Sequence, residues 1–129
     1  MDESKALSLS SSALAFLGDA VQSAYVRRML VERHDVKGGS LAELEKSYVS
    51  ARAQATMCES IMGLLTETES GVVRRAINTK TNNKAKNAAR GEYRLATGYE
   101  ALIGFLKVTG EEERLSEILA LTNSKEIIK

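Results

Sequence analysis

The sequence has few of the residues that mark many enzyme classes. Its 129 residues include no proline, no tryptophan, one cysteine (Cys58) and one histidine (His34). A single cysteine cannot form an internal disulfide bond, and one cysteine with one histidine supplies no zinc cluster. We find no Cys/His or Ser/His arrangement for nucleophilic catalysis. Cys58 lies in an apolar helical stretch, where we expect it to be buried and inert.

Long apolar runs are also absent. No stretch approaches the 20 or so residues of a membrane span, and no secretory signal precedes the first periodic segment. We therefore expect a soluble cytoplasmic protein with no membrane contact. The length fits one domain over residues 1–129, with loose ends at 1–8 and 123–129. The lack of proline and the abundance of Ala, Leu, Glu, Lys and Arg predict an all-α fold.

Charge is unevenly distributed along the chain. The formal net charge is only +1, yet the segment 74–94 carries seven basic residues and one acid, about +6. The remainder is therefore about −5. This polarity favours a local anionic partner, although a charge run is more usually a solvated face.

Helical periodicity and start signals divide the chain into about six to seven helices. The first runs from Ser10 or Ser11 to Glu32 or Arg33 and ends in the polar connector 34–39, whose glycine pair is a stop signal. Capping boxes at Ser40, Thr66 and Thr109 predict three further starts. Another helix follows a break at 48–50. We expect residues 80–90 to form an exposed loop, with a long helix over 91–108.

The stretch Ala13 to Val21 is the first anomaly. It is apolar except for Asp19, and Gly18 beside this acid weakens a helix by roughly 1 kcal/mol relative to alanine. Such a glycine is tolerated where another backbone or a ligand comes close. The alternative is a packing glycine beside an aspartate that caps a helix or forms a salt bridge.

A similar anomaly lies at Tyr99 to Leu106. Glu100 is the one charge between Arg94 and Lys107, and Gly104 follows one turn later. An ionised carboxylate in such surroundings is costly without a cation, a hydrogen-bond network or a metal. The two helices could cross at their glycines and face both acids into one pocket. The alternative is that Glu100 pairs with an arginine.

These segments resemble the ribonuclease III catalytic domain. Phe-Leu-Gly-Asp-Ala-Val at 16–21 is similar to the signature of that family, and Glu-Ala-Leu-Ile-Gly at 100–104 is similar to its second acidic motif. Segments 13–21, 48–51 and 93–105 together resemble the variant that lacks a double-stranded-RNA-binding domain, Mini-ribonuclease III. The resemblance covers nearly the whole chain.

The resemblance implies a helical endonuclease domain that hydrolyses double-stranded RNA and leaves 5′-phosphate and 3′-hydroxyl ends. Asp19 and Glu100 would be the catalytic metal ligands for Mg²⁺, with Mn²⁺ as a substitute, because hard cations prefer carboxylate oxygens and substrate phosphate. Larger members of the family have further acids where this chain has Ser12, Ala15 and Thr97. This difference favours one metal ion per site.

The resemblance also implies the partners. Cleavage of two strands calls for a homodimer with twofold symmetry, and the expected task is maturation of large-subunit ribosomal RNA precursor, with a ribosomal protein as a potential helper. The residues expected to contact RNA are Arg74, Arg75, Lys80, Lys84, Lys86 and Arg90. The alternatives are a catalytically silent RNA-binding module and a protein-binding adaptor of the same fold.

Overall fold

The chain folds into helices in the part that the structure describes. The structure is a computed structural model that describes residues 1–33, 38–79, 87–124 and 126–127, with only the backbone for residues 38 and 87–90. These ranges contain seven α-helices, one 3₁₀ helix and no strand, which confirms the predicted all-α fold. In order, they are α1 (Glu3–Leu7), α2 (Ser11–Arg33), α3 (Gly38–Val49), α4 (Ala51–Ile61), η1 (Met62–Leu64), α5 (Glu67–Asn78), α6 (Asn87–Val108) and α7 (Glu112–Thr122).

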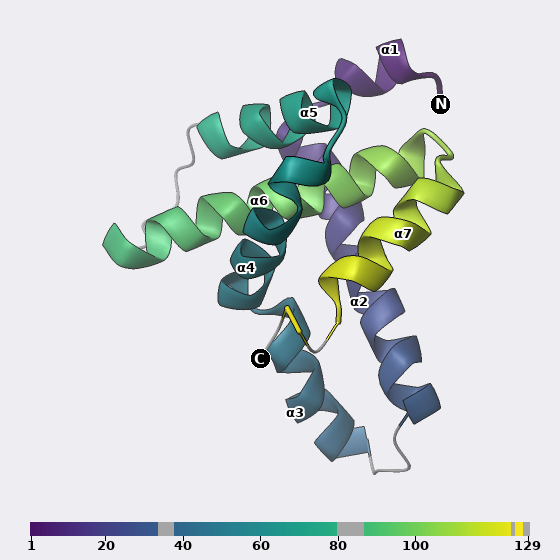
Figure 1. Cartoon of the computed structure of the whole chain (residues 1–129), viewed down its shortest axis with the longest axis vertical. Coiled ribbons are helices and arrows are strands. Elements are labelled where there is room, and N and C mark those ends of the chain that lie inside the picture. Colours follow the sequence, from purple (N-terminus) through teal and green to yellow (C-terminus); the bar gives the residue numbers. More distant parts are fainter. Residues whose placement is uncertain (34–37, 80–86, 125, 128–129) are drawn as a thin grey trace.

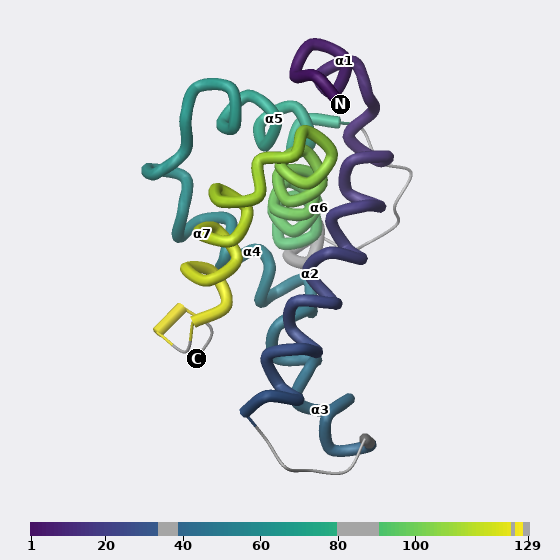
Figure 2. The backbone as a smooth tube through the Cα atoms, turned by 90° about the vertical axis from the view of Figure 1, so that its right-hand side faces the viewer, coloured from purple at the N-terminus to yellow at the C-terminus, as the bar shows by residue number. Residues whose placement is uncertain are grey.

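The long helix α6 runs through the centre of the fold. It packs against α2, α4, α5 and α7, and α2 crosses it (Figure 1). The second half of α2 extends beyond α6 and packs against α3 in a small apolar cluster around Val26, Met29 and Leu30 (Figure 2). None of the helices in the described ranges has the length and apolar content that a bilayer crossing requires.

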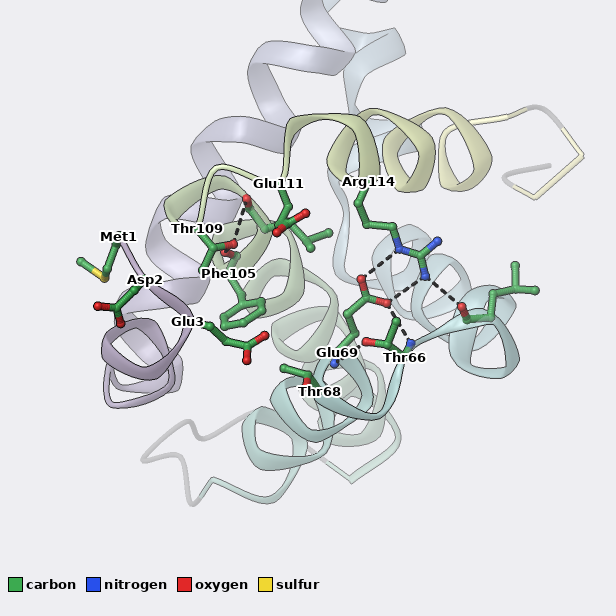
Figure 3. Close-up of a pocket in the computed structure, with 12 residues that line it drawn as sticks. Met1, Asp2, Glu3, Thr66, Thr68, Glu69, Phe105, Thr109, Glu111 and Arg114 are labelled. Atoms are coloured by element: carbon green, nitrogen blue, oxygen red, sulfur yellow. Dashed lines mark hydrogen bonds and ion pairs between the residues drawn. The ribbon is translucent and has the colours of Figure 1, made fainter.

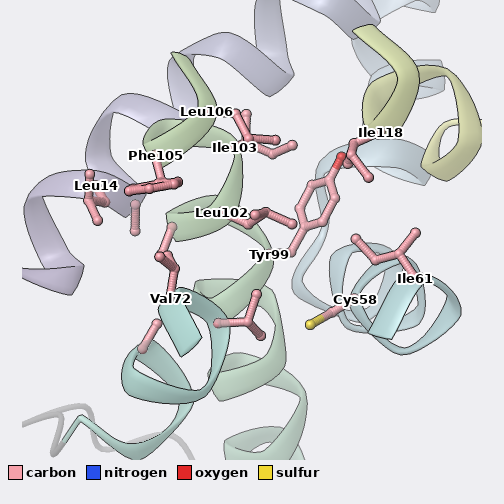
Figure 4. Packing of buried hydrophobic residues seen from close by; sticks show 14 of the residues in the cluster. Leu14, Cys58, Ile61, Val72, Tyr99, Leu102, Ile103, Phe105, Leu106 and Ile118 are labelled. Carbon is pink, nitrogen blue, oxygen red and sulfur yellow. The ribbon is translucent and has the colours of Figure 1, made fainter. Parts of the chain in front are cut away.

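The apolar stretch of α6 forms the main core. Tyr99, Leu102 and Ile103 have no exposed surface, and Phe105 and Leu106 are at most 3% exposed. Side chains from the surrounding helices, such as Leu14 and Val72, enclose this stretch (Figure 4). A helix that is apolar on every side is stable only where every side is covered. The four neighbouring helices provide that cover within one chain, so burial of this stretch needs no second subunit.

The N-terminal residues are anchored, so the prediction that 1–8 form a loose end is wrong. Residues 3–7 form the short helix α1, and Ala6 is completely buried. The amino group of Met1 donates to the carbonyl oxygen of Val108 at 3.1 Å. The Arg75 guanidinium donates to the carbonyl oxygens of Leu7 and Leu9 at 2.6 and 3.2 Å. Hydrophobic periodicity cannot predict these contacts, because their acceptors are backbone carbonyl groups.

The start of the other terminal segment is also ordered, in contrast to the predicted loose end at 123–129. Asn123 is only 2% exposed and exchanges two hydrogen bonds with the Gln22 amide, at 2.8 and 3.2 Å. The Tyr99 hydroxyl donates to Gln22 Oε1 at 2.9 Å and lies 2.8 Å from the Thr122 hydroxyl. This buried network attaches the end of α7 to α2 and α6. The polar residues at 123–129 predicted an exposed tail, because the sequence does not show that distant residues bond to Asn123.

Two predicted helix starts are confirmed. At α5, the Thr66 hydroxyl accepts from the Glu69 backbone N–H at 3.1 Å, and the Glu69 carboxylate accepts from the Thr66 N–H at 2.9 Å. This is the predicted capping box. At α2, which begins at Ser11, the Ser10 hydroxyl accepts from the Ala13 N–H at 3.0 Å. The helix α2 continues to Arg33, the last residue described before the gap at 34–37.

The other two predicted capping boxes are wrong. The helix α3 already begins at Gly38, so Ser40 lies inside its first turn and the glycine pair opens this helix. Thr109 does not cap α7, because its hydroxyl donates back to the carbonyl oxygen of Phe105 at 2.7 Å. Glu111 is the residue that precedes α7. Sequence spacing identifies a potential cap, but the path of the preceding chain decides whether it is used.

Candidate active site

The first residue of the candidate site, Asp19, lies on α2 where this helix meets α6. Its neighbour Gly18 is buried against α6, while the Asp19 side chain is exposed. A Cβ atom on Gly18 would lie 1.8 Å from the carbonyl oxygen of Glu100, a distance that no side chain can occupy. The glycine therefore lets the backbones of the two helices touch.

Gly104 on α6 has the corresponding role. A Cβ atom there would lie 1.9 Å from the carbonyl oxygen of Leu14 and 3.1 Å from the Gly18 nitrogen. Both glycines thus stand at one backbone contact, which is the helix crossing expected from the sequence. Because Asp19 follows Gly18 and Glu100 precedes Gly104 by one turn, the crossing places the two acids side by side.

The two carboxyl groups lie within hydrogen-bonding reach of each other. Glu100 is partly buried, and burial, followed by the adjacent Asp19 carboxylate, raises the pKa of Glu100 to about 8. Among the residues that the structure describes, no lysine or arginine forms an ion pair with either acid. The alternative in which an arginine neutralises Glu100 is therefore not found in the described ranges.

A third residue at this site, Gln54, was not identified from the sequence. It lies on α4, is 2% exposed, and its amide approaches the Glu100 carboxyl closely enough to favour the ionised form and oppose the rise in pKa. The available signal was a lone amide in the apolar run around Ala53, Ala55 and Met57.

The two carboxylates at the crossing suit one hard cation that takes few ligands from the protein. No group of three or more His, Cys, Asp or Glu side chains suited to a metal occurs among the described residues. Two carboxylates are the protein contribution that Mg²⁺ commonly uses, since it retains several waters and takes phosphate oxygens from the substrate. A cation would also compensate the mutual repulsion of two ionised carboxylates at this contact. The residues present therefore fit such an ion.

The positions at which larger family members have acids are occupied by uncharged side chains. Ser12 is exposed and Ala15 is buried, both on α2 ahead of Asp19. Thr97 is partly buried, and its hydroxyl donates to the carbonyl oxygen of Tyr93 at 2.9 Å. None of these groups adds a carboxylate to the pair at the crossing.

The structure describes the side chains of only two of the six residues predicted to bind RNA. Arg74 is exposed on α5, and Arg75 donates to the Leu7 and Leu9 carbonyl oxygens as described above. Lys80, Lys84 and Lys86 lie outside the described residues, as does the Arg90 side chain. The backbone of 87–90 belongs to α6, which begins at Asn87, so this part of the predicted loop is helical instead.

Two other features of the fold lie away from the acid pair. Cys58 is completely buried, and burial raises its pKa to about 11, which keeps the thiol protonated as expected for an inert residue. A pocket of about 750 Å³ lies between α1, α5 and the junction of α6 with α7, bordered by the Glu69 and Arg114 pair (Figure 3). Its lining residues include neither Asp19 nor Glu100.

Comparison with known proteins gives consistent matches. Residues 12–111 match the family model of the ribonuclease III domain. The chain is 45% identical over 113 residues to the Mini-ribonuclease 3 of Symbiobacterium thermophilum, a match that covers 88% of this chain and 87% of that protein. It is 47% identical over 106 residues to the Mini-ribonuclease 3 of Brevibacillus brevis, with 82% and 79% covered.

The fold has a counterpart among solved structures. A crystal structure of a protein from Fusobacterium nucleatum matches with a TM-score of 0.79 at 29% identity, covering 88% of this chain and 91% of that one. The segment matched by the family model contains both acids and both glycines of the helix crossing. The chain therefore belongs to the ribonuclease III domain family, within its Mini-ribonuclease 3 group, and is an endoribonuclease.

Proposed function

We propose that the chain hydrolyses double-stranded RNA and that Asp19 and Glu100 together hold the Mg²⁺ ion that the reaction requires. The observation that carries this proposal is the carboxyl pair at the α2–α6 crossing, where two acids meet within the described ranges without a protein cation. Such an arrangement is unfavourable unless a proton or a metal ion compensates it. Hydrolysis of double-stranded RNA by a member of this family would employ such a metal ion.

The chemistry needs no protein nucleophile. When bound, Mg²⁺ polarises the scissile phosphate and lowers the pKa of a bound water, so that hydroxide can attack phosphorus in line. Asp19 is exposed, so its carboxylate would both help to hold the cation and orient the attacking water. Glu100 is partly buried and would hold the cation in its ionised form. The products are 5′-phosphate and 3′-hydroxyl ends.

Basic residues from 74 to 90 would contact the RNA backbone. Arg74 is exposed and available, whereas both terminal nitrogens of Arg75 donate to backbone carbonyls, which favours a structural role for this arginine. Lys80, Lys84, Lys86 and Arg90 remain part of the proposal on charge alone. Each phosphate neutralised should add about 0.9 to the slope of log affinity against log salt, by analogy with duplex DNA.

A homodimer would bring two such sites to the two strands, and the surface of α2 supports it. Phe16 is 84% exposed and Val31 is 64% exposed. With the exposed Ala13, Ala20 and Ala24, they form one helical face, here called the α2 apolar stripe. Exposed large apolar side chains near Asp19 are typical of a protein interface, and the same face also carries Arg27 between Ala24 and Val31. A twofold axis along this stripe would use the same surface on both subunits.

Membership of the Mini-ribonuclease 3 group supports a proposal for the cellular role. We propose that it acts in the cytoplasm on a precursor of large-subunit ribosomal RNA, with Mn²⁺ able to replace Mg²⁺ and a ribosomal protein helping to present the RNA. Residues 1–129 would act as one catalytic domain, since α1 and the end of α7 pack on the segment matched by the family model.

The test is cleavage of a duplex RNA by the full chain with and without Mg²⁺, together with Asp19→Asn and Glu100→Gln. We expect the wild-type protein to cleave the duplex only when Mg²⁺ is present. The cleavage rate should fall at least about 100-fold in each variant. An RNA complex that forms without cleavage would indicate a silent binding module. No affinity for the duplex at either of two salt concentrations would indicate a protein adaptor.

A further inference from the structure

Gln54 is a buried amide that lacks a hydrogen bond. Its side chain lies on α4 and is 2% exposed. Its Nε2 group makes no hydrogen bond to any partner that the structure describes, and within the same ranges it is the one buried side-chain polar atom in this condition. An unpaired buried N–H group lowers stability, because it has lost its bonds to water without replacement.

The other completely buried glutamine shows how this protein otherwise treats such groups. Gln22 is 0% exposed, donates to Asn123 Oδ1 at 2.8 Å, and accepts from the Tyr99 hydroxyl at 2.9 Å. The core can therefore satisfy a buried amide where the amide serves the fold. Gln54 differs because its Nε2 group has no hydrogen-bond partner among the described residues.

The group that Gln54 faces is Glu100. Its amide lies within reach of the Glu100 carboxyl, yet the Nε2 group has no hydrogen bond of good geometry. Gln54 is only 2% exposed, so a bulky RNA phosphate cannot approach its amide. A hydrogen bond to the Glu100 carboxylate would satisfy this N–H group.

We propose that Gln54 is a positioning residue for Glu100: its Nε2 group donates to one carboxylate oxygen and thereby directs the other oxygen toward the metal ion. This inference rests on the proposed function, since it assumes that Glu100 binds a cation. Carboxylates that bind metal ions commonly accept a hydrogen bond from a neighbouring group, and loss of that group weakens metal binding about 10- to 100-fold. The buried Gln54 amide would then hold Glu100 in the orientation that binds the cation.

The proposal makes Gln54→Met informative, because methionine has a similar length but no donor. If Gln54 served only packing, methionine would leave metal binding unchanged. We expect this variant to unfold at the same temperature as wild type or higher without metal, because the unpaired group is gone. We also expect its Mn²⁺ dissociation constant to rise at least tenfold.

The experiment compares full-length wild type, Gln54→Met and Ile61→Val, a control that removes one methyl group from the same face of α4. The measurements are the unfolding temperature without metal, Mn²⁺ affinity by calorimetry, and kcat and KM on a duplex RNA. We expect kcat of Gln54→Met to fall at saturating RNA while KM stays within about twofold, and Ile61→Val to keep wild-type Mn²⁺ affinity.

Each outcome decides between the two hypotheses. A Gln54→Met protein that binds Mn²⁺ as wild type does would overturn the role of Gln54 and leave the proposed function intact. A variant that is unfolded or less stable than Ile61→Val would also overturn it, because Gln54 would then support the fold. A wild-type protein that neither binds Mn²⁺ nor cleaves RNA would overturn the proposed function, and the role of Gln54 with it.

Discussion

The α-carbon of Gly18 faces the backbone carbonyl of Glu100 so closely that an added Cβ atom would lie 1.8 Å from the carbonyl oxygen. This contact fixes the spacing of α2 and α6 at the point where each helix carries an acid. Gly104 makes the reciprocal contact with Leu14. The separation of Asp19 and Glu100 therefore depends on the absence of a side chain at both glycines. A change at either glycine should affect both the fold and the site.

Gly18→Ala and Gly104→Ala should each destabilise the protein by about 2–3 kcal/mol or more, since the new methyl group meets backbone that cannot move aside. Denaturant unfolding measures this change, and a parallel Mn²⁺ titration should show weaker binding as the acids separate. Gly71→Ala is the matched control. Gly71 is an exposed position inside α5 with no atom within 4 Å of an added Cβ. Alanine there should stabilise by about 0.4–1 kcal/mol.

The stability of the metal-free protein should fall as the pH rises from about 5 to 8. The pKa of Glu100 is raised from 4.5 to about 8 in the folded state, chiefly by burial and then by Asp19. Over this interval the folded protein keeps a proton that the unfolded chain releases, so unfolding is favoured by higher pH. The loss should be about 2 kcal/mol, because solvent partly screens the carboxyl group. Chemical denaturation in EDTA at several pH values measures it.

Glu100→Gln provides the control for that pH dependence. The amide cannot titrate, so the variant should lose most of the decline between pH 5 and 8 and should be more stable than wild type at pH 8. Saturating Mg²⁺ should also reduce the decline in wild type, because the cation replaces the proton between the acids. An unchanged pH profile in Glu100→Gln would mean that another group is responsible.

The Glu69 and Arg114 pair should contribute to stability without affecting the metal site. The Arg114 guanidinium donates to both Glu69 oxygens at 2.8 and 2.9 Å and lowers the pKa of this carboxyl group. Arg114→Met leaves a buried carboxylate without its cation and should cost about 2–3 kcal/mol at pH 7. The loss should shrink as the pH falls, because burial without the Arg114 cation favours proton uptake by Glu69 in the variant. Denaturant unfolding at pH 7 and 4 tests both statements.

Lys46→Met is the matched control for the Arg114 variant. Lys46 pairs with Glu43 at 3.2 Å, but both side chains are more than 70% exposed, so its removal should change stability by less than about 0.5 kcal/mol. Mn²⁺ affinity should be unchanged in both variants. Weaker metal binding in Arg114→Met would show that this pair influences the site at the crossing.

Phe16→Glu should shift the protein from dimer to monomer. The ring is 84% exposed in the α2 apolar stripe, and a charge there opposes burial against a second copy. Sedimentation velocity over a range of concentrations measures the mass. Leu64→Glu, a charge introduced at a position that is 57% exposed and lies on η1, should leave it unchanged. A wild-type protein that stays monomeric at high concentration would exclude this interface.

Several features were predictable because their physical cause is local in the sequence. Thr66 and Glu69 lie at capping-box spacing, and both reciprocal hydrogen bonds are present. Tyr99 to Leu106 is apolar on all sides, which requires a central helix. A glycine beside a lone acid on each of two helices predicted a close crossing, because no other residue permits such backbone contact.

Other features depend on contacts between distant residues and could not be predicted. Asn123 looked like part of a polar tail, but its partner Gln22 lies 101 residues away. Ser40 looked like a helix cap, but it lies inside α3, so spacing alone misplaced the start. Gln54 is the clearest case at the site, because a buried amide without a hydrogen bond is recognised only when its surroundings are known.

The central claim is that Asp19 and Glu100 share one divalent cation. Its most direct test is Mn²⁺ binding to the RNA-free protein by calorimetry at pH 7.5, with wild type, Asp19→Asn and Glu100→Gln. The account predicts one Mn²⁺ per chain in the wild-type protein and a loss of affinity of at least tenfold in each variant. Unchanged affinity in either variant, with its fold intact, would contradict it.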